Sequence, residues 1–189
     1  MGETLERPPA RHRLDVDAYY KMAEAGILTR AHRVELIDGE IIDLNAIGSP
    51  HAAITNRLNR IFVPAVDGKA LVSVQSPLRL DAYNEPEPDL MVLRPRADDY
   101  RANHPSAADV LLLVEVSDSS LTYDRGRKLA LYAHFGVPEV WIADLVGSAV
   151  EVFRQPQKDA YSSQKRQTSG LLTPELVEWV EVDVAALLA

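Results

Sequence analysis

The sequence predicts an α/β domain in which one mixed β-sheet is flanked by helices. Its 189 residues suit a single domain with a hydrophobic core. Helix-like and strand-like segments follow in the order helix, hairpin, helix, several strands, helix, strand. The run 110–116 is the most apolar in the chain, which is typical of a central strand buried on both faces.

Composition excludes several classes of protein. The apolar fraction of 47% and the charged fraction of 25% are ordinary for a globular domain. The absence of cysteine excludes disulfides, thiolate metal sites and cysteine nucleophiles. No stretch approaches the roughly 20 apolar residues that cross a bilayer, and the N-terminus has no apolar signal segment. We therefore expect a cytoplasmic protein with no membrane partner.

The formal net charge of −8 bears on possible partners. A protein whose main task is to coat nucleic acid usually presents a basic face, so this charge argues against that class. An enzyme that acts on nucleic acid is not excluded. Bound divalent cations offset negative charge, and a local basic rim can guide a phosphate backbone.

We expect residues 1–13 to form a disordered lead and residues 14–189 to form one domain. Asp15 is expected to cap a helix over residues 16–25 that ends at Gly26. The pair Asp38-Gly39 between two apolar runs predicts a β-hairpin.

A second helix is expected over residues 50–63, with Ser49 as its N-cap and Pro50 at its first position. Strands are expected at 71–75 and 78–80, with an interruption at Pro77, and then at 90–93. The polar segment 94–108 is expected to be a surface loop.

The C-terminal half predicts one more long helix and further strands. Asp124 is expected to cap a helix from residue 125 to about residue 135, ended by Gly136. Strands are expected at 140–143 and from 150, and the polar segment 155–170 is expected to be a connection. Asp183 is expected to cap a short final helix over 184–188.

Two acidic residues occupy positions that stability does not explain. Asp89 begins the strand 90–93, and Glu115 lies near the end of the apolar run 110–116. Burying a carboxylate costs several kcal/mol unless it finds a cation, hydrogen bonds or a proton. If the two strands are neighbours and end together, both carboxylates face one cleft. Two oxygen ligands on rigid strands, with water completing the shell, suit Mg²⁺.

Lys128 follows about one turn inside the helix after the Glu115 strand. From there its side chain can point back over the strand ends. An ammonium group beside a bound metal and a phosphodiester can orient the attacking water and stabilise developing charge.

Several segments together resemble the PD-(D/E)XK restriction-endonuclease-like superfamily, and within it the Uma-type family of bacterial proteins. They are Pro88-Asp89, Glu115-Val116-Ser117, residues 124–132 (DRGRKLALY) and residues 136–141 (GVPEVW), with residues 34–40 (VELIDGE) and Ser49-Pro50-His51. The resemblance covers residues 15 to about 155. Each motif alone is unspecific, and their order and spacing carry the resemblance.

The resemblance implies a restriction-endonuclease-like core and cleavage of phosphodiester bonds in nucleic acid, with DNA the expected substrate. It implies Mg²⁺ or Mn²⁺ held by Asp89, Glu115 and the main-chain carbonyl of Val116. Glu35 resembles the acidic residue that precedes the core, and His51 is expected in the same cleft. By analogy with short nuclease domains we also expect a homodimer.

One departure from the superfamily pattern concerns the catalytic lysine. The superfamily places it two residues after the glutamate, where this chain has Ser117. The helix residue Lys128 is expected to take its place, because position in space matters more than position in sequence.

Each of these residues also has a structural interpretation. Asp89 can simply end a turn, Glu115 can form a structural ion pair, and Lys128 can belong to a solvated charge run. Glu35 can face outward from its hairpin, and His51 can be a surface or capping residue. Gln75 and Asp144 stay open between a role at the cleft and a structural role, whereas Tyr132 and Trp141 are expected in the core or an interface.

A second class of function is a binding or regulatory module that keeps the fold and has little or no turnover. The net charge and Ser117 favour this alternative. The placement of five arginines distinguishes the two, because a ring of basic residues around the carboxylates would hold a phosphate backbone. These arginines are Arg94, Arg96, Arg101, Arg125 and Arg127.

Overall fold

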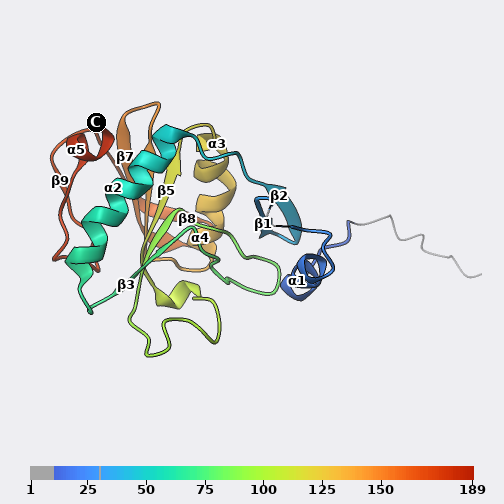
Figure 1. The fold of residues 1–189 in the computed structure, drawn as a ribbon. Helices are drawn as coiled ribbons and strands as arrows, with labels where there is room; N and C mark the ends of the chain where they lie inside the picture. The colour runs from blue at the N-terminus through green and yellow to red at the C-terminus, as the bar shows by residue number, and fades with distance from the viewer. Residues whose placement is uncertain (1–10, 30) are drawn as a thin grey trace, which may run out of the picture.

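The computed structural model describes residues 11–29 and 31–189, and its centre is a six-stranded sheet (Figure 1). The strands lie in the order β3-β4-β5-β6-β7-β8. Their bounds are Leu71–Val74, Leu90–Leu93, Val110–Ser117, Glu139–Asp144, Ala149–Gln157 and Ala160–Gln167. Only β5 and β6 pair in parallel; the other neighbours are antiparallel. The predicted mixed sheet is therefore confirmed.

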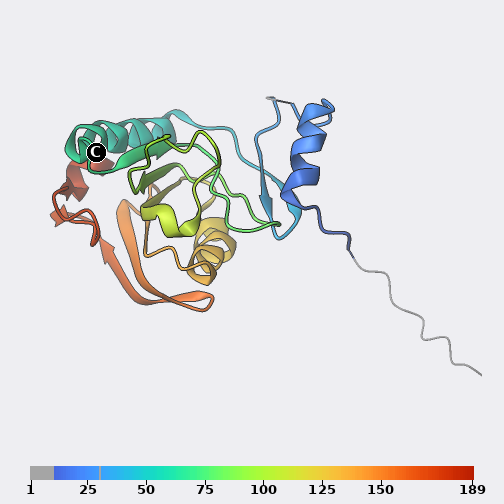
Figure 2. The same cartoon turned by 90° about the horizontal axis from the view of Figure 1, so that it is seen from below.

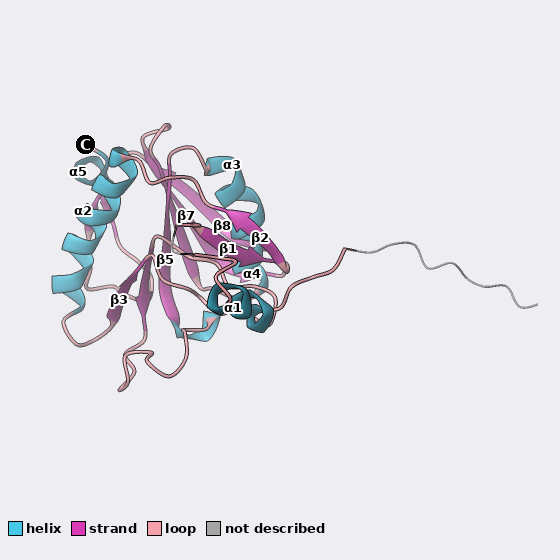
Figure 3. Cartoon of the chain, turned by 45° about the vertical axis from the view of Figure 1, so that its right-hand side comes forward, coloured by secondary structure: helices cyan, strands magenta, loops and turns pink. Residues whose placement is uncertain are grey.

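Helices cover both faces of this sheet (Figure 3). On one face, α2 (Ser49–Val66) and α5 (Val184–Leu188) pack their apolar side chains against the sheet. On the other face lies a helical run made of α3 (Leu121–Tyr123), a π-helical turn (Asp124–Lys128) and α4 (Leu129–His134). All eight residues of β5 are buried, as expected for a central strand between two helical layers.

A smaller N-terminal unit lies at one side of the sheet (Figure 2). It consists of α1 (Val16–Glu24) and the hairpin of β1 (Val34–Ile37) and β2 (Glu40–Asp43). The expected Asp15 cap is present, since its carboxylate accepts a hydrogen bond from the Ala18 N–H at 2.7 Å. The Asp38-Gly39 turn is also present, with positive φ angles of 55° and 74°. Residues 1–10 of the expected lead lie outside the described residues.

Four expectations about elements and their boundaries are wrong. Gly48 rather than Ser49 is the N-cap of α2, and this helix continues past Pro64 to Val66. Residues 78–80 form no strand, because the Leu78 N–H bonds to the Pro86 carbonyl within the segment that leads to β4. Asp124 is not an N-cap, because the helical run already begins at Leu121.

The C-terminal part differs most from the expectation. Residues 155–170 are not a polar connection, because β7 continues to Gln157 and β8 returns antiparallel over Ala160–Gln167. β8 is an edge strand whose side chains are exposed or half-buried, so its sequence carries little apolar signal. A small sheet of β9 (Leu171–Leu172) and β10 (Val182–Asp183) follows. Asp183 caps α5 as expected.

One further expectation, the loop after β4, holds over most of its length. The segment 94–106 is a loop, followed by a single 3₁₀ turn, Ala107–Asp109, before β5. Within the described ranges, no helix combines the length and apolar content that crossing a membrane requires.

Candidate active site

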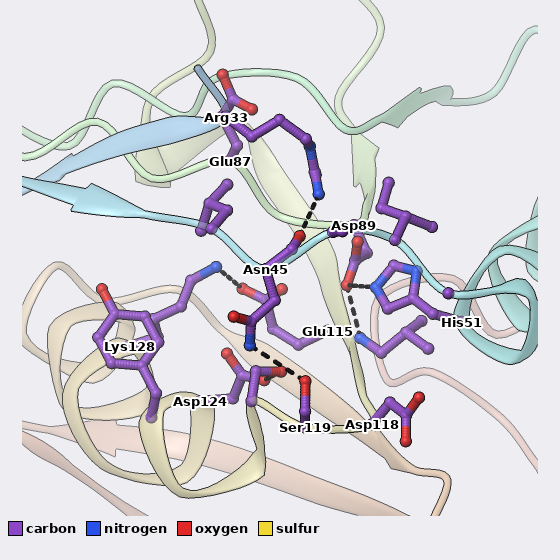
Figure 4. A pocket seen from close by; sticks show the side chains of 17 residues that line it. Arg33, Asn45, His51, Glu87, Asp89, Glu115, Asp118, Ser119, Asp124 and Lys128 are labelled. Atoms are coloured by element: carbon purple, nitrogen blue, oxygen red, sulfur yellow. Dashed lines mark hydrogen bonds and ion pairs between the residues drawn. The ribbon is translucent and has the colours of Figure 1, made fainter. Parts of the chain in front are cut away.

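Asp89 and Glu115 meet in one pocket at one end of the central sheet (Figure 4). β4 and β5 are antiparallel, with Leu90 paired to Val114, so the start of β4 and the end of β5 lie side by side. The expected cleft between two neighbouring strands is therefore present. Its volume is about 90 Å³, which suits an ion with its waters better than an organic cofactor.

The Asp89 carboxylate is held by contacts on one of its two oxygens. Its Oδ2 accepts a hydrogen bond from the Val116 N–H at 2.8 Å and lies 3.0 Å from the His51 Nε2. Among the residues that the structure describes, its Oδ1 has only a long contact of 3.5 Å with the Gln75 amide. His51 therefore belongs to the pocket, and its side chain, 15% exposed, is not a surface residue.

Glu115 is buried and contacts two polar groups through a single oxygen. Its Oε1 accepts a hydrogen bond from the Tyr132 hydroxyl at 2.6 Å and lies 2.7 Å from the Lys128 Nζ. Burial raises the pKa of the Glu115 carboxyl, and the nearby Lys128 ammonium opposes that rise. Lys128 points back over the strand ends as expected, and its exposure of 4% contradicts the alternative of a solvated charge run.

Glu35 forms the second acidic contact of Lys128. Its Oε2 lies 3.3 Å from the Lys128 Nζ and accepts the Glu87 N–H at 3.0 Å, and its Oε1 accepts the Tyr123 hydroxyl at 3.1 Å. Glu35 is fully buried, so the outward-facing alternative is wrong. Burial lowers the pKa of Lys128, but the carboxylates of Glu115 and Glu35 outweigh it and hold this pKa well above its ordinary value.

Ser117 occupies the position where the superfamily has its lysine. Its hydroxyl donates to the Asp124 carboxylate at 2.7 Å, and the Ser120 hydroxyl donates to the same oxygen at 2.6 Å. Burial raises the pKa of Asp124. The strand thus supplies no cation two residues after Glu115, and Lys128 supplies one from the neighbouring helix.

The donor atoms of the pocket fit a hard divalent cation. Among the described residues, no three His, Cys, Asp or Glu side chains are grouped to hold a metal, so an ion would depend on two carboxylates, main-chain oxygen and water. Mg²⁺ commonly binds in this way and keeps several waters. Asp89 Oδ1 has only its long contact, and Glu115 Oε2 accepts no hydrogen bond from the described part of the chain. Each carboxylate therefore keeps one oxygen for an ion.

The Val116 carbonyl faces the side of β5 where Asp89 lies. Successive residues of a strand direct their main-chain groups to opposite sides. The Ser117 carbonyl accepts the Leu145 N–H at 3.0 Å and so faces β6. The Val116 N–H points the other way, to Asp89, and its carbonyl shares that direction. This orientation is the one that a metal ligand at Val116 requires.

The five arginines considered for a basic ring do not line the pocket. Arg94 donates to the Ala108 carbonyl and Arg96 pairs with Asp98, both in the loop that follows β4; Arg101 belongs to the same loop. Arg125 pairs with Asp144 and Glu151, and Arg127 pairs with Asp38 and Glu40. These arginines therefore do not form a basic ring around the carboxylates that would hold a phosphate backbone. In the described chain, the Arg and Lys residues that line the pocket are Arg33 and Lys128.

Sequence reasoning missed three polar side chains of this site. Tyr132 is buried as expected, but its hydroxyl contacts Glu115. Its position four residues after Lys128 could have indicated this, because residues four apart lie on the same face of a helix. Tyr123 and Arg33 carried no such signal.

Asp144 proves to be a turn residue, since it accepts the Gly147 N–H at 2.7 Å and pairs with Arg125. Trp141 is fully buried in the core.

The chain is thus an α/β domain whose mixed sheet has two carboxylates and a lysine at one end. The chain belongs to the Uma2 family, described as "Putative restriction endonuclease", whose family model matches residues 16–185. This match confirms the resemblance inferred from the sequence motifs.

A solved structure has the same fold. It is the crystal structure of "a putative nuclease belonging to DUF820" from Anabaena variabilis ATCC 29413, which superposes with a TM-score of 0.73 at 18% sequence identity. The match covers 93% of this chain and 97% of that chain, so it extends over nearly the whole of both. Comparison with curated proteins finds no match.

Proposed function

We propose that the chain is a nuclease that hydrolyses phosphodiester bonds of DNA with the help of Mg²⁺ or Mn²⁺. The observation that carries this proposal is the meeting of Asp89, Glu115 and Lys128 in one pocket at the end of β4 and β5. The ion would be held by Asp89, Glu115 and the Val116 carbonyl. Once bound, it would lower the pKa of a water molecule and polarise the phosphate.

The chain's own residues have distinct roles in this proposal. Lys128 holds Glu115 in place and directs positive charge at the phosphate, where negative charge grows in the transition state. Glu35 keeps the Lys128 side chain oriented and protonated. His51 fixes the orientation of the Asp89 carboxylate through Oδ2, so that Oδ1 could hold the ion.

A second candidate is a binding or regulatory module with weak or no turnover. Specific observations favour it: the net charge is −8, the strand lysine is replaced by Ser117, and the five arginines lie away from the pocket. Such a module would bind nucleic acid, or a divalent ion alone, without cutting.

The decisive experiment is cleavage of plasmid, linear and single-stranded DNA with Mg²⁺ or Mn²⁺. The wild type is compared with Asp89→Asn and Glu115→Gln, which keep the shape of each side chain and remove its charge. Metal-dependent cutting that both substitutions abolish supports the nuclease. Equal cutting by all three proteins would point to a contaminant and reject the site.

A second measurement separates metal binding from turnover. Titration with Mn²⁺ by calorimetry should detect binding to the wild type and weaker binding to both variants. Metal binding without any cutting of DNA or RNA would favour the non-catalytic module.

We also propose that residues 14–189 form one domain, and that the protein acts as a homodimer in the cytoplasm. The bridge between Leu36 and Glu85 and the ion pair between Glu35 and Lys128 support the first point. They join the N-terminal unit to the segment before β4 and to the π-helical turn. Light scattering coupled to size-exclusion chromatography tests the dimer; a monomer mass at micromolar concentration would reject it.

A further inference from the structure

Arg33 lies at the mouth of the pocket, just before β1 (Figure 4). Its main-chain carbonyl accepts the Leu44 N–H at 2.8 Å, so the backbone at this point is fixed by the hairpin. Its side chain reaches the Asn45 carbonyl, 2.6 Å from Nη1. The Asn45 amide in turn donates to the Ser119 hydroxyl at 3.1 Å. The guanidinium group therefore lies beside the loop 44–48, and Asn45 links this loop to the one that follows β5.

In the described part of the chain, no carboxylate neutralises the charge of Arg33 at ion-pair distance. Within the described residues it forms no ion pair, and its one side-chain hydrogen bond goes to a neutral carbonyl. A guanidinium has five N–H donors, so most of them stay open to a ligand. Glu87 is close enough for Arg33 to oppose the rise in its pKa that burial causes, but no ion pair joins them. Lys128, by contrast, already contacts two carboxylates.

The rest of the pocket would repel a phosphodiester. Its lining includes the acidic residues Glu87, Asp89, Glu115, Asp118 and Asp124. A divalent ion offsets part of this charge at the reacting phosphate, but the strand on either side needs a cation of its own. The planar fork of a guanidinium matches the oxygens of a phosphate group.

We propose that Arg33 binds a phosphate of the nucleic-acid strand next to the phosphodiester that is cut. This inference rests on the proposed nuclease function and adds a substrate-binding residue to it. The competing explanation is that Arg33 only tethers the loop 44–48 through Asn45.

Two substitutions separate phosphate binding from tethering. Arg33→Gln removes the charge and keeps a polar side chain. Arg33→Lys keeps the charge and loses the fork. The matched control is Arg101→Gln, which removes the same charge from the loop that leaves the opposite end of β4.

The measurement is fluorescence anisotropy with a labelled single-stranded oligodeoxynucleotide in Ca²⁺, repeated over a range of salt concentrations. For Arg33→Gln we expect Kd to rise about tenfold, as for the loss of a charged hydrogen bond. We also expect the slope of log K against log salt to become shallower by about 0.7, the value for one phosphate contact on a single strand. Arg33→Lys should restore the slope and leave Kd intermediate, and Arg101→Gln should change neither.

Cleavage kinetics give an independent reading. With Mg²⁺ or Mn²⁺, Arg33→Gln should raise KM about tenfold and change kcat by less than about threefold, because the contact is made equally in the ground and transition states.

The outcomes distinguish this inference from the proposal on which it rests. If the wild type cuts DNA and Arg33→Gln has the same Kd, salt slope and KM, Arg33 is not a phosphate-binding residue and the nuclease proposal stands. A lower Tm with an unchanged slope would assign Arg33 to the tether alone. If the wild type neither binds nor cuts nucleic acid with any of these ions, both proposals fail together.

Discussion

At the scale of single residues, Lys128 dominates the electrostatics of the pocket. It is buried and lies within ion-pair distance of two buried carboxylates, Glu115 and Glu35. Removing one partner of a buried ion pair leaves charge in the interior without compensation, which costs more than the pair itself contributes. Lys128 is therefore needed for the folded state as well as for the proposed chemistry.

We predict that Lys128→Met lowers the free energy of unfolding by about 3–5 kcal/mol, the range for breaking a buried pair. Methionine keeps most of the apolar volume of the lysine stem, so the loss reports the missing charge. Urea denaturation in EDTA, followed by Trp fluorescence, measures it without interference from bound metal.

The double variant Lys128→Met with Glu115→Gln is the control for this prediction. Because it removes one of the two stranded carboxylates, it should be less destabilised than the single variant. If both proteins lose the same free energy, the effect comes from packing and the electrostatic explanation is wrong.

Apart from residues that the family resemblance or a helix position indicated, the residues of the pocket could be found from sequence where their chemistry conflicted with their surroundings. Asp89 and Glu115 stood out as carboxylates beside apolar strands, and the structure places both in the pocket. Tyr123 and Tyr132 did not stand out, because a tyrosine is equally at home in a core. The direction of a hydroxyl depends on rotamers and packing that no local pattern records.

At the scale of elements, the π-helical turn between α3 and α4 carries the central residues of the site. Asp124 and Lys128, its first and last residues, are both buried against the sheet. Gly126 lies between them on the exposed side, and a Cβ atom added there would meet nothing within 4 Å. The outer side of this turn is therefore under little packing constraint.

We predict that Gly126→Ala raises the free energy of unfolding by about 0.5–1 kcal/mol, because alanine restricts the unfolded chain and fits a helical backbone. Urea denaturation measures the change, and DNA cleavage should be unaffected.

Gly39→Ala is the matched comparison and should have the opposite effect. Gly39 has a φ of 74°, and an added Cβ would lie 2.7 Å from the Arg13 Cβ. A gain in stability from this substitution would contradict the geometry of the hairpin turn, and a loss from Gly126→Ala would contradict the open side of the helical run.

Elements were predictable where the apolar pattern was strong, as in β4, β5 and β6. β8 was missed because an edge strand with exposed side chains lacks that pattern. The start of the helical run was misplaced because Asp124 has the chemistry of an N-cap. Its carboxylate instead accepts the hydroxyls of Ser117 and Ser120, a contact that involves the preceding strand.

At the scale of the whole molecule, stability depends on two apolar layers, one on each face of the sheet. On one face the ring of Phe62, from α2, packs edge-on against Trp141 of β6, with centroids 6.2 Å apart. Both side chains are fully buried. This contact ties a helix from the first half of the chain to the centre of the sheet.

We predict that Phe62→Ala lowers the free energy of unfolding by about 3–5 kcal/mol, the cost of a cavity left by a large aromatic ring. Phe62→Leu keeps most of the volume and should cost less than about 1.5 kcal/mol. Chemical denaturation measures both. Equal losses would show that the contact with the Trp141 ring, rather than the filled volume, is what matters.

The architecture could be predicted as a mixed sheet between helices, because the order of elements and the apolar run of β5 leave few other arrangements. The direction of each pairing could not. Every strand of the sheet pairs with the next one along the chain, and of these pairs β5 and β6 alone are parallel. Which neighbours run parallel is set by packing across the whole domain.

The burial of Lys128 also decides how the protein can be handled chemically. The remaining lysines, Lys21, Lys69, Lys158 and Lys165, are exposed. An amine-reactive dye or biotin ester will therefore modify these four side chains and leave the ammonium group of the pocket untouched. Protein attached to a sensor surface through its amines should therefore keep the pocket around Lys128 chemically unmodified.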